Sequence, residues 1–388
     1  MAKLLEVAGP KGKSSHNRLR SGLKKWRAQE KAKTKACKRI SYGNQPPLST
    51  HNDTSSSTKP LLRKLSKQQA NLVKPHTKYD DGPDHSKEIH LELCKEHQKV
   101  IFTTLRKRVF EETKLSDFEA LLGKGESVPT GLIASDMKAR YRAGKYTIQA
   151  IDDLYKRKQS DDDLNVYLVT FVDERFNVNI RNGVVEGVKL KDKVYNAIKS
   201  HTGMSALLFV ENQVMVNYPK GSEGEVMCAH VHGVMWGYDK EDVQRLLTRT
   251  RGFKSNITKL PVHCVKMHPT EGSFSRVARY LAKPPYEGKE VDYRKYDEGK
   301  PCLFMARRVE KYQHLRLFEY MAKTPIDKMI FSVREGKLVR EKILSDLKAW
   351  HRKRKGTRID TSDVDGLFKR FYADNRKLKR YQPMQVRW

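Results

Sequence analysis

Two histidines one residue apart in an apolar stretch are the first sign of chemistry in this chain. His230 and His232 flank Val231 within the run 226–236, whose apolar content is typical of a buried strand. Side chains on a strand alternate between its two faces, so both imidazoles should point the same way. Two imidazoles on one face supply half of a divalent-metal site. The pair therefore predicts metal-dependent chemistry if neighbouring elements complete the site.

Segment 164–285 contains the elements that would position this pair. Strands are expected where β-branched and aromatic residues dominate, and helices where apolar residues recur every three or four positions. This reasoning predicts, in order, strand 164–172, helix 189–201, strand 206–211, strand 226–236, helix 239–252, strand 260–265 and helix 273–283. The order β-α-β-β-α-β-α is that of a ferredoxin-like (split βαβ) antiparallel sheet with one extra helix, which is an α+β fold.

Composition divides the rest of the chain. Residues 1–85 are polar and basic, with a low-complexity run at 49–58, and are expected to be a disordered tail. A helical lead-in is predicted over 86–160, the catalytic domain over 161–290, and a basic helical region over 291–388. In the last region cations alternate with aromatic residues. This pattern indicates stacking of the aromatics on unpaired bases, their packing into the core, or both.

The charge balance points to a polyanionic partner. The 388 residues carry 78 Lys and Arg against 46 Asp and Glu, a formal net charge of +32. Nucleic acid is the first candidate partner, and a merely basic soluble protein is the alternative. The five cysteines are scattered without a CxxC motif, so neither a disulfide framework nor a zinc ribbon is indicated. The sequence contains no signal core and no membrane-length apolar run, so we expect a cytoplasmic protein.

A second motif gives the histidine pair a family context. Tyr280-Leu281-Ala282-Lys283 lies on the expected helix directly after the fourth strand. A ferredoxin-like sheet with His-hydrophobic-His on an inner strand and Tyr-x-x-Lys on this helix resembles the HUH endonuclease superfamily, in particular the rolling-circle replication initiators of plasmids and phages. Strand 167–171 lies where those initiators carry their first, structural motif. The resemblance covers about a third of the chain.

The resemblance implies an enzyme that nicks one DNA strand at an origin. His230 and His232 would hold Mg²⁺ or Mn²⁺, which neutralises a non-bridging oxygen of the scissile phosphate. Tyr280 would be the nucleophile, leaving a 5′-phosphotyrosine link and a free 3′-OH. A free phenol has a pKa near 10, so the metal or the Lys283 ammonium must favour its ionised form. The sequence has no helicase phosphate loop, so unwinding would need a host helicase.

The third metal ligand is expected on the neighbouring strand. Folding the hairpin about 219–224 sets Glu211 roughly opposite His230 or His232. Many viral and plasmid initiators complete their site with an acidic residue on this strand, so the resemblance favours Glu211. Glu225 is nearer in sequence but should fall on the opposite face. The alternative is that Glu211 lies at the surface without a role.

The Tyr-x-x-Lys spacing is not unique, so position has to select the nucleophile. Tyr155 precedes the expected sheet, and Tyr320 lies on a later helix. Tyr280 is favoured because its helix follows the fourth strand directly. A mechanism with a second tyrosine could use Tyr286 or Tyr320. The alternative without a catalytic role is that Tyr280 is an ordinary residue of an amphipathic helix.

Other functions stay open at this level. Transposases and relaxases of the same superfamily share the catalytic core, although a relaxase would more often carry three clustered histidines. A basic DNA-binding protein with packed histidines is the non-enzymatic alternative. A structural zinc site is a further one, built from a subset of Cys228, His230, His232, His263, Cys264 and His268.

Overall fold

The computed structural model describes residues 86–108, 112–218, 225–237, 240–249, 252–255, 261–269, 272–285, 287–293, 303–375, 378 and 381–388. All of them belong to the compact unit Thr58–Trp388. The predicted disordered tail 1–85 and Tyr286 lie outside the described residues. None of the helices in the described segments combines the length and apolar character needed to cross a bilayer.

Helices form close to where apolar periodicity predicts them. They are α3 (Ser86–Arg106), α4 (Glu112–Leu121), α5 (Met137–Ser160), α6 (Gly187–His201), α7 (Lys240–Arg249), α8 (Ser273–Ala282), α9 (Lys311–Ala322), α10 (Ile326–Met329), α11 (Gly336–Arg352) and α12 (Val364–Asp374), with the 3-10 helix η1 (Glu174–Phe176). The predicted lead-in consists of α3, α4 and α5 with one short strand between α4 and α5. Helix α8 ends just before Pro284, whose missing amide hydrogen cannot continue the helix.

The strands of the described segments form one large sheet and two small ones. They are β1 (Val128–Pro129), β2 (Asn165–Val172), β3 (Val178–Asn179), β4 (Val184–Glu186), β5 (Ser205–Val216), β6 (Glu225–Gly237), β7 (Val262–Lys266), β8 (Glu287–Asp292), β9 (Leu303–Arg308), β10 (Ile330–Val333), β11 (Arg358–Ile359) and β12 (Gln385–Arg387). The large sheet has the order β7-β2-β6-β5-β8-β9, with β10 paired to β5 and β3 to β6. All these pairs are antiparallel except β5–β8. The chain is thus a mixed α+β protein with a mostly antiparallel sheet.

The region after residue 290 differs in part from the prediction. It contains helices α9 to α12, as expected, but it also supplies β9 and β10 to the large sheet. Strand β10 pairs with β5, which is one of the strands predicted for the catalytic domain. The basic helical region expected over 291–388 is therefore not purely helical, and it shares its sheet with the segment before it.

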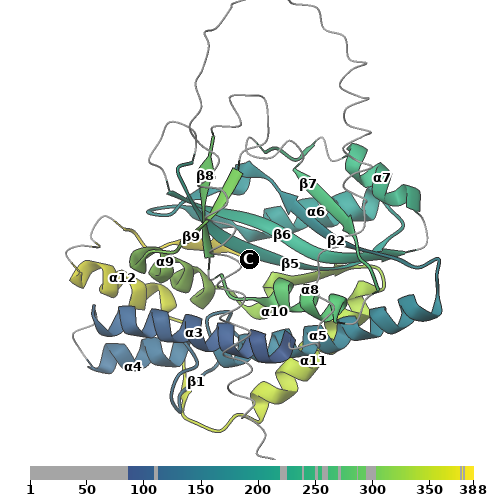
Figure 1. Ribbon diagram of the computed structural model, residues 1–388. Coiled ribbons are helices and arrows are strands. Elements are labelled where there is room, and N and C mark those ends of the chain that lie inside the picture. The colour runs from purple at the N-terminus through teal and green to yellow at the C-terminus, as the bar shows by residue number, and fades with distance from the viewer. Residues whose placement is uncertain are drawn as a thin grey trace, which may run out of the picture. The chain divides into compact units, whose positions relative to one another are not determined.

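The two faces of the sheet carry different cores. On β6, Val231 and Met235 pack with apolar residues of α6 and α7, whereas Val234 and Trp236 pack with residues of α5, α8 and α11. Figure 1 shows α6 and α7 on one side of the sheet, with α5, α8 and α11 on the other. This division follows from the alternation of side chains along a strand. The even-numbered positions of β6, which include both candidate histidines, face the α5–α8 side.

The aromatic residues near the C-terminus pack inward. Phe368 and Phe371 of α12 are 0% and 3% exposed, and both lie against the ring of Phe118 from α4. Of the two interpretations of the alternating cations and aromatics, the structure supports core packing for these rings. The cations between them, such as Lys369 and Arg370, are exposed.

Candidate metal centre and active site

The pairing of β5 with β6 brings three metal-ligating side chains together. Glu211 lies directly opposite His230, and His232 is the next residue on the same face of β6. The Oε2 atom of Glu211 is 3.7 Å from Nε2 of His230 and 3.6 Å from Nε2 of His232. Ligand atoms around one ion with bonds near 2.1 Å stand roughly 3 to 3.5 Å apart, so this spacing suits a single divalent cation.

Hydrogen bonds on the far side of each imidazole orient its ring. His230 Nδ1 lies 3.2 Å from the carbonyl oxygen of Cys228, which can only accept, so Nδ1 carries the proton and donates it. This tautomer leaves the Nε2 lone pair of His230 free to bind a metal. Nδ1 of His232 lies 2.7 Å from the hydroxyl oxygen of Thr170 on β2. Partners of this kind fix the ring orientation of histidine ligands.

The electrostatics of the cluster suit a cation. Burial lowers the pKa of His230 below its ordinary value, although the Glu211 carboxylate opposes this shift. Burial lowers the pKa of His232 well below its ordinary value, with His230 and Lys283 as further causes. Both imidazoles are therefore neutral near pH 7, as metal ligation requires. The Oε2 atom of Glu211 is buried and makes no hydrogen bond, so a bound cation would offset its desolvation.

Helix α8 places the candidate nucleophile beside this cluster. The hydroxyl oxygen of Tyr280 lies 3.2 Å from Nε2 of His232, and the two rings meet edge to face with centroids 5.0 Å apart. The Lys283 ammonium lies 4.2 Å from the centroid of the Tyr280 ring. Both side chains are half-buried, so they remain accessible in part to a substrate.

Contacts from α5 hold α8 in this position. The hydroxyl of Ser275 donates to the Asp152 carboxylate at 2.6 Å. The guanidinium of Arg140, which is 5% exposed, donates to the carbonyl oxygen of Lys283 at 2.9 Å, directly after the last turn of α8. Neither Arg140 nor Thr170 was predicted from the sequence. Thr170 could have been found from the register of β2 with β6, whereas no local pattern marks Arg140, which lies 143 positions from Lys283.

The other tyrosines with the same spacing lie in different surroundings. Tyr320 is 1% exposed, and its ring packs near that of Trp388. Burial raises the pKa of Tyr320, which disfavours the phenolate. The ring of Tyr155 meets that of Phe274 at 5.5 Å. Among the tyrosines that the structure describes with this spacing, Tyr280 is the one hydrogen-bonded to the histidine cluster.

The ligand sets considered as alternatives are not assembled within the described segments. Among the described residues, Glu211, His230 and His232 form the only group of three metal-ligating side chains whose ligand atoms lie within 4.8 Å of one another. Cys264 packs into the core on the other face of the sheet. The Glu225 carboxylate accepts hydrogen bonds from the Tyr312 hydroxyl and, at 3.1 Å, from the Gln313 amide. The described geometry thus favours Glu211 over Glu225 as the third ligand.

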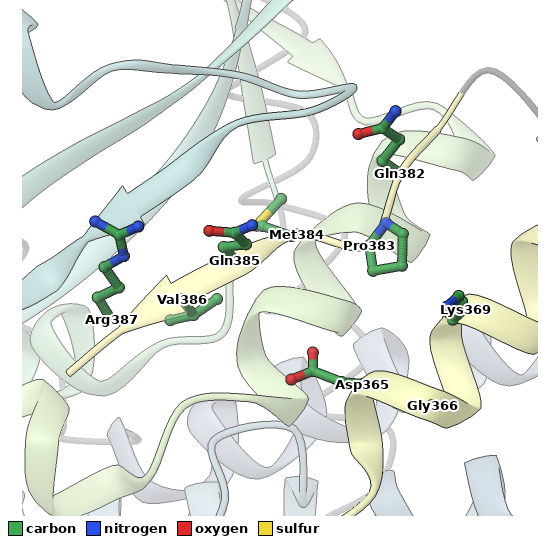
Figure 2. Close-up of a pocket in the computed structure, with 9 residues that line it drawn as sticks. All are labelled: Asp365, Gly366, Lys369, Gln382, Pro383, Met384, Gln385, Val386 and Arg387. Carbon is green, nitrogen blue, oxygen red and sulfur yellow. The ribbon is translucent and has the colours of Figure 1, made fainter.

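A separate pocket lies at the C-terminal segment. Figure 2 shows it between α12, which contributes Asp365 and Lys369, and the segment that contains β12. Asp365 is ion-paired with Lys323, the residue directly after α9, and Lys323 also pairs with the buried carboxylate of Glu319. None of the residues predicted to act in catalysis or metal binding lines this pocket.

Comparison with known proteins identifies no relative, because no family model, no curated protein and no solved structure matches this chain. The chemical interpretation of the site therefore depends on its own geometry.

Proposed function

We propose that this chain is a metal-dependent endonuclease of the HUH type that nicks and rejoins one DNA strand as a rolling-circle replication initiator. The observation that carries the proposal is the contact between Tyr280 and His232 at 3.2 Å, within a buried Glu/His/His cluster. A phenol beside three convergent ligands is the arrangement that tyrosine attack on a phosphodiester requires.

The strand order supports a ferredoxin-like core for this site. Strands β7, β2, β6 and β5 lie in this order and each is antiparallel to its neighbours, so β2 and β5 run parallel to each other on either side of β6. Helix α6 connects β2 to β5, and α7 connects β6 to β7, which is the split βαβ pattern. Strands β8, β9 and β10 would then be additions to that core.

In the proposed reaction the chain holds the metal, aims the nucleophile and stabilises its charge. Glu211, His230 and His232 would bind Mn²⁺ or Mg²⁺, and imidazole ligands favour Mn²⁺. When bound, the ion neutralises a non-bridging oxygen of the scissile phosphate. The Tyr280 oxygen attacks phosphorus while the bond from phosphorus to the 3′-oxygen breaks, and the phenolic proton ends on that 3′-oxygen. The Lys283 ammonium stabilises the negative charge that develops on the phenolic oxygen.

The products would be a 5′-phosphotyrosine and a free 3′-OH. Attack by a 3′-OH on the phosphotyrosine reverses the step and rejoins the strand without an outside energy source. The strand-joining activity therefore needs no group beyond those that perform cleavage.

The test is adduct formation with labelled single-stranded or supercoiled DNA from the replicon of this protein. Protein and DNA are incubated with Mn²⁺, Mg²⁺ or EDTA and resolved on a denaturing gel. We expect a covalent adduct that depends on metal and disappears in Tyr280→Phe. Tyr320→Phe is the matched control, because it removes one hydroxyl from a buried tyrosine with the same Tyr-x-x-Lys spacing.

The outcomes separate the candidate functions. Loss of the adduct in Tyr320→Phe alone would assign the nucleophile to α9 and refute the role of Tyr280. DNA retention without any adduct, on a substrate that contains the origin, would refute the enzyme and favour a basic DNA-binding protein.

A further inference from the structure

Two stretches of the described chain carry cations without any acidic residue. Residues 137–151, the first part of α5, contain four Lys and Arg and no Asp or Glu. Residues 347–359, which include the end of α11, contain six Lys and Arg and no Asp or Glu. Surface charges of one sign usually alternate with the other, so acid-free stretches of this kind concentrate positive potential.

The two stretches meet in space. The Arg142 guanidinium of α5 lies 5.7 Å from the ring centroid of Trp350 on α11, and Arg354 lies 5.1 Å from the same ring. Arg354 also pairs with the Asp136 carboxylate, which caps the first turn of α5 and is 0% exposed. The C-terminal end of α11 is thereby fixed against the beginning of α5, and Figure 1 shows these two helices together.

The cations form one surface, here called the α5–α11 basic surface. It consists of Lys138, Arg142, Lys145, Lys353 and Lys355, and it lies beside the buried ion pair of Arg354 with Asp136. Lys138, Arg142 and Lys145 follow i, i+4, i+7 spacing and lie along the outward side of α5. Lys138, Lys353 and Lys355 are exposed, and Arg142 and Lys145 are half-buried.

The aromatic rings in this surface are already engaged within the protein. Two guanidinium groups pack against Trp350. The neighbouring Tyr141 stacks with His90 at 6.0 Å and has Arg142 at 5.9 Å from its centroid. Proteins that bind single strands offer aromatic faces on which bases stack. This surface instead presents charges, which suits the sugar–phosphate backbone of a duplex.

The spacing of the cations along α5 matches the spacing of phosphates along a DNA strand. Lys138 and Lys145 are seven residues apart on α5, which corresponds to about 10 Å along the helix axis. Along one strand of a duplex the axial rise is about 3.4 Å per phosphate, so the length of α5 between these two lysines faces roughly three phosphates.

We propose that the α5–α11 basic surface binds the phosphate backbone of duplex DNA, at a site separate from the metal centre. The choice of DNA over RNA rests on the proposed function, whereas the binding itself does not require nicking. Helix α5 connects the two sites: Arg140 faces inward and donates to the carbonyl of Lys283, while Arg142 lies on the outward side. A duplex held on the outside of α5 would stand in a fixed relation to the nucleophile on α8.

The test compares two variants that lose the same charge. The surface variant replaces Lys138, Lys145, Lys353 and Lys355 by Gln. The control variant replaces four exposed lysines that already pair with a carboxylate, at 3.0, 3.6, 3.4 and 2.8 Å respectively: Lys95, Lys156, Lys189 and Lys342. Affinity of the full chain for a labelled duplex of about 20 base pairs is measured by fluorescence anisotropy in EDTA over a range of salt concentrations.

We expect the surface variant to bind the duplex at least tenfold more weakly near physiological salt. The slope of log K against log salt should fall by about 2 to 4, because each lost phosphate contact removes about 0.9. The control should stay within about twofold of the parent at the same salt, because its lysines are neutralised by acids. Equal losses in both variants, or a loss confined to single-stranded DNA, would overturn the proposal. A duplex RNA bound more tightly than the DNA would overturn the choice of ligand.

Adduct formation on a short single-stranded substrate with Mn²⁺ separates this inference from the proposed function. The surface variant should form the adduct at the rate of the parent, because its substitutions leave the metal centre intact. If the parent forms no adduct but the duplex result holds, the nicking function fails and the basic surface stands. If the surface variant loses adduct formation on that substrate, the two sites are not separate.

Discussion

Two groups of buried histidines lie in the part of the chain that the structure describes, and their surroundings differ. His230 and His232 lie on β6 beside Glu211, which is also buried. His90 and His97 lie about two turns apart on one face of α3, and the ring of His97 meets an imidazole of α9 with centroids 5.8 Å apart. Burial lowers the pKa of all four of these imidazoles on α3 and β6.

The difference lies in the charged neighbours. At His230 the charge with the largest effect is the Glu211 carboxylate, which raises the pKa of the imidazole and attracts cations, whereas Lys289 and Lys283 have a smaller, opposite effect. At His90 the charged neighbours are Arg140 and Arg279, which lower the pKa further, to about 4. Burial also raises the pKa of Cys94, next to His90, to about 12, so the thiol stays protonated. Neutral imidazoles are thus necessary for a metal site but not sufficient, and a convergent anion decides which group can hold a cation.

The largest expected effect comes from removing that anion. Glu211→Gln keeps the volume of the side chain but replaces the charged ligand by a neutral amide. Removing one partner of a buried charge pair costs roughly 3 to 5 kcal/mol, so we expect Mn²⁺ affinity to fall about a thousandfold. Electron paramagnetic resonance of free Mn²⁺ measures this directly.

His90→Asn is the control for Glu211→Gln. It removes a buried imidazole that has cationic neighbours, and it should leave Mn²⁺ affinity within about twofold, since no metal contact is lost. A comparable loss of Mn²⁺ binding in His90→Asn would show that the contrast between the two histidine groups is false.

The choice of Glu211 also shows how far the sequence could lead. A hairpin folded about 219–224 places residue 211 roughly opposite 230 or 232, because antiparallel pairing follows from the turn position, and the observed register pairs Glu211 with His230. The end of β5 was placed too early, at 211 instead of 216, because Asn212 and Gln213 interrupt the apolar run. Pairing with β6 continues through both residues and overrides their low strand propensity.

Elements that depend on distant partners were not predictable. Strand β8 has the sequence Glu-Gly-Lys-Glu-Val-Asp, which shows no apolar alternation, and its pairing with β5 and β9 is a tertiary effect. Arg140 reaches Lys283 only because α5 and α8 pack together. Local periodicity contains no information on such contacts. For the same reason, the sequence could not decide whether the aromatic residues of region 291–388 pack into the core or stack on bases.

The second largest expected effect is a pH dependence of folding stability, caused by the buried His90 of α3. The folded-state pKa of His90 is about 4, below the ordinary 6.5, so this imidazole resists protonation only in the folded protein. The unfolded chain binds more protons between these values, so stability is complete above about pH 6.5 and is lost as the pH falls toward 4. The loss assigned to His90 is about 3 kcal/mol.

Urea unfolding at several pH values checks the sign and size of this effect. In His90→Asn, the decrease in unfolding free energy between pH 6.5 and 4 should shrink by about 3 kcal/mol relative to the parent. Mn²⁺ should leave this difference unchanged, because His90 is not a ligand. If the unfolding free energies of the parent and of His90→Asn depended on pH in the same way, this would contradict the burial of a neutral imidazole at position 90.

The smallest expected effect comes from the residue that orients a ligand. Thr170→Val is nearly isosteric and removes the hydroxyl that lies 2.7 Å from Nδ1 of His232. Loss of a hydrogen-bond partner of a histidine ligand typically weakens metal binding 10- to 100-fold. We therefore expect Thr170→Val to bind Mn²⁺ 10- to 100-fold more weakly than the parent. Thr147→Val is the matched control, since the hydroxyl of Thr147 is buried in α5 and donates to the carbonyl of Ala143. Because the hydroxyl of Thr147 bonds within its own helix, equal weakening of Mn²⁺ binding in both variants would mean that Thr170 acts through general packing and not through the imidazole of His232.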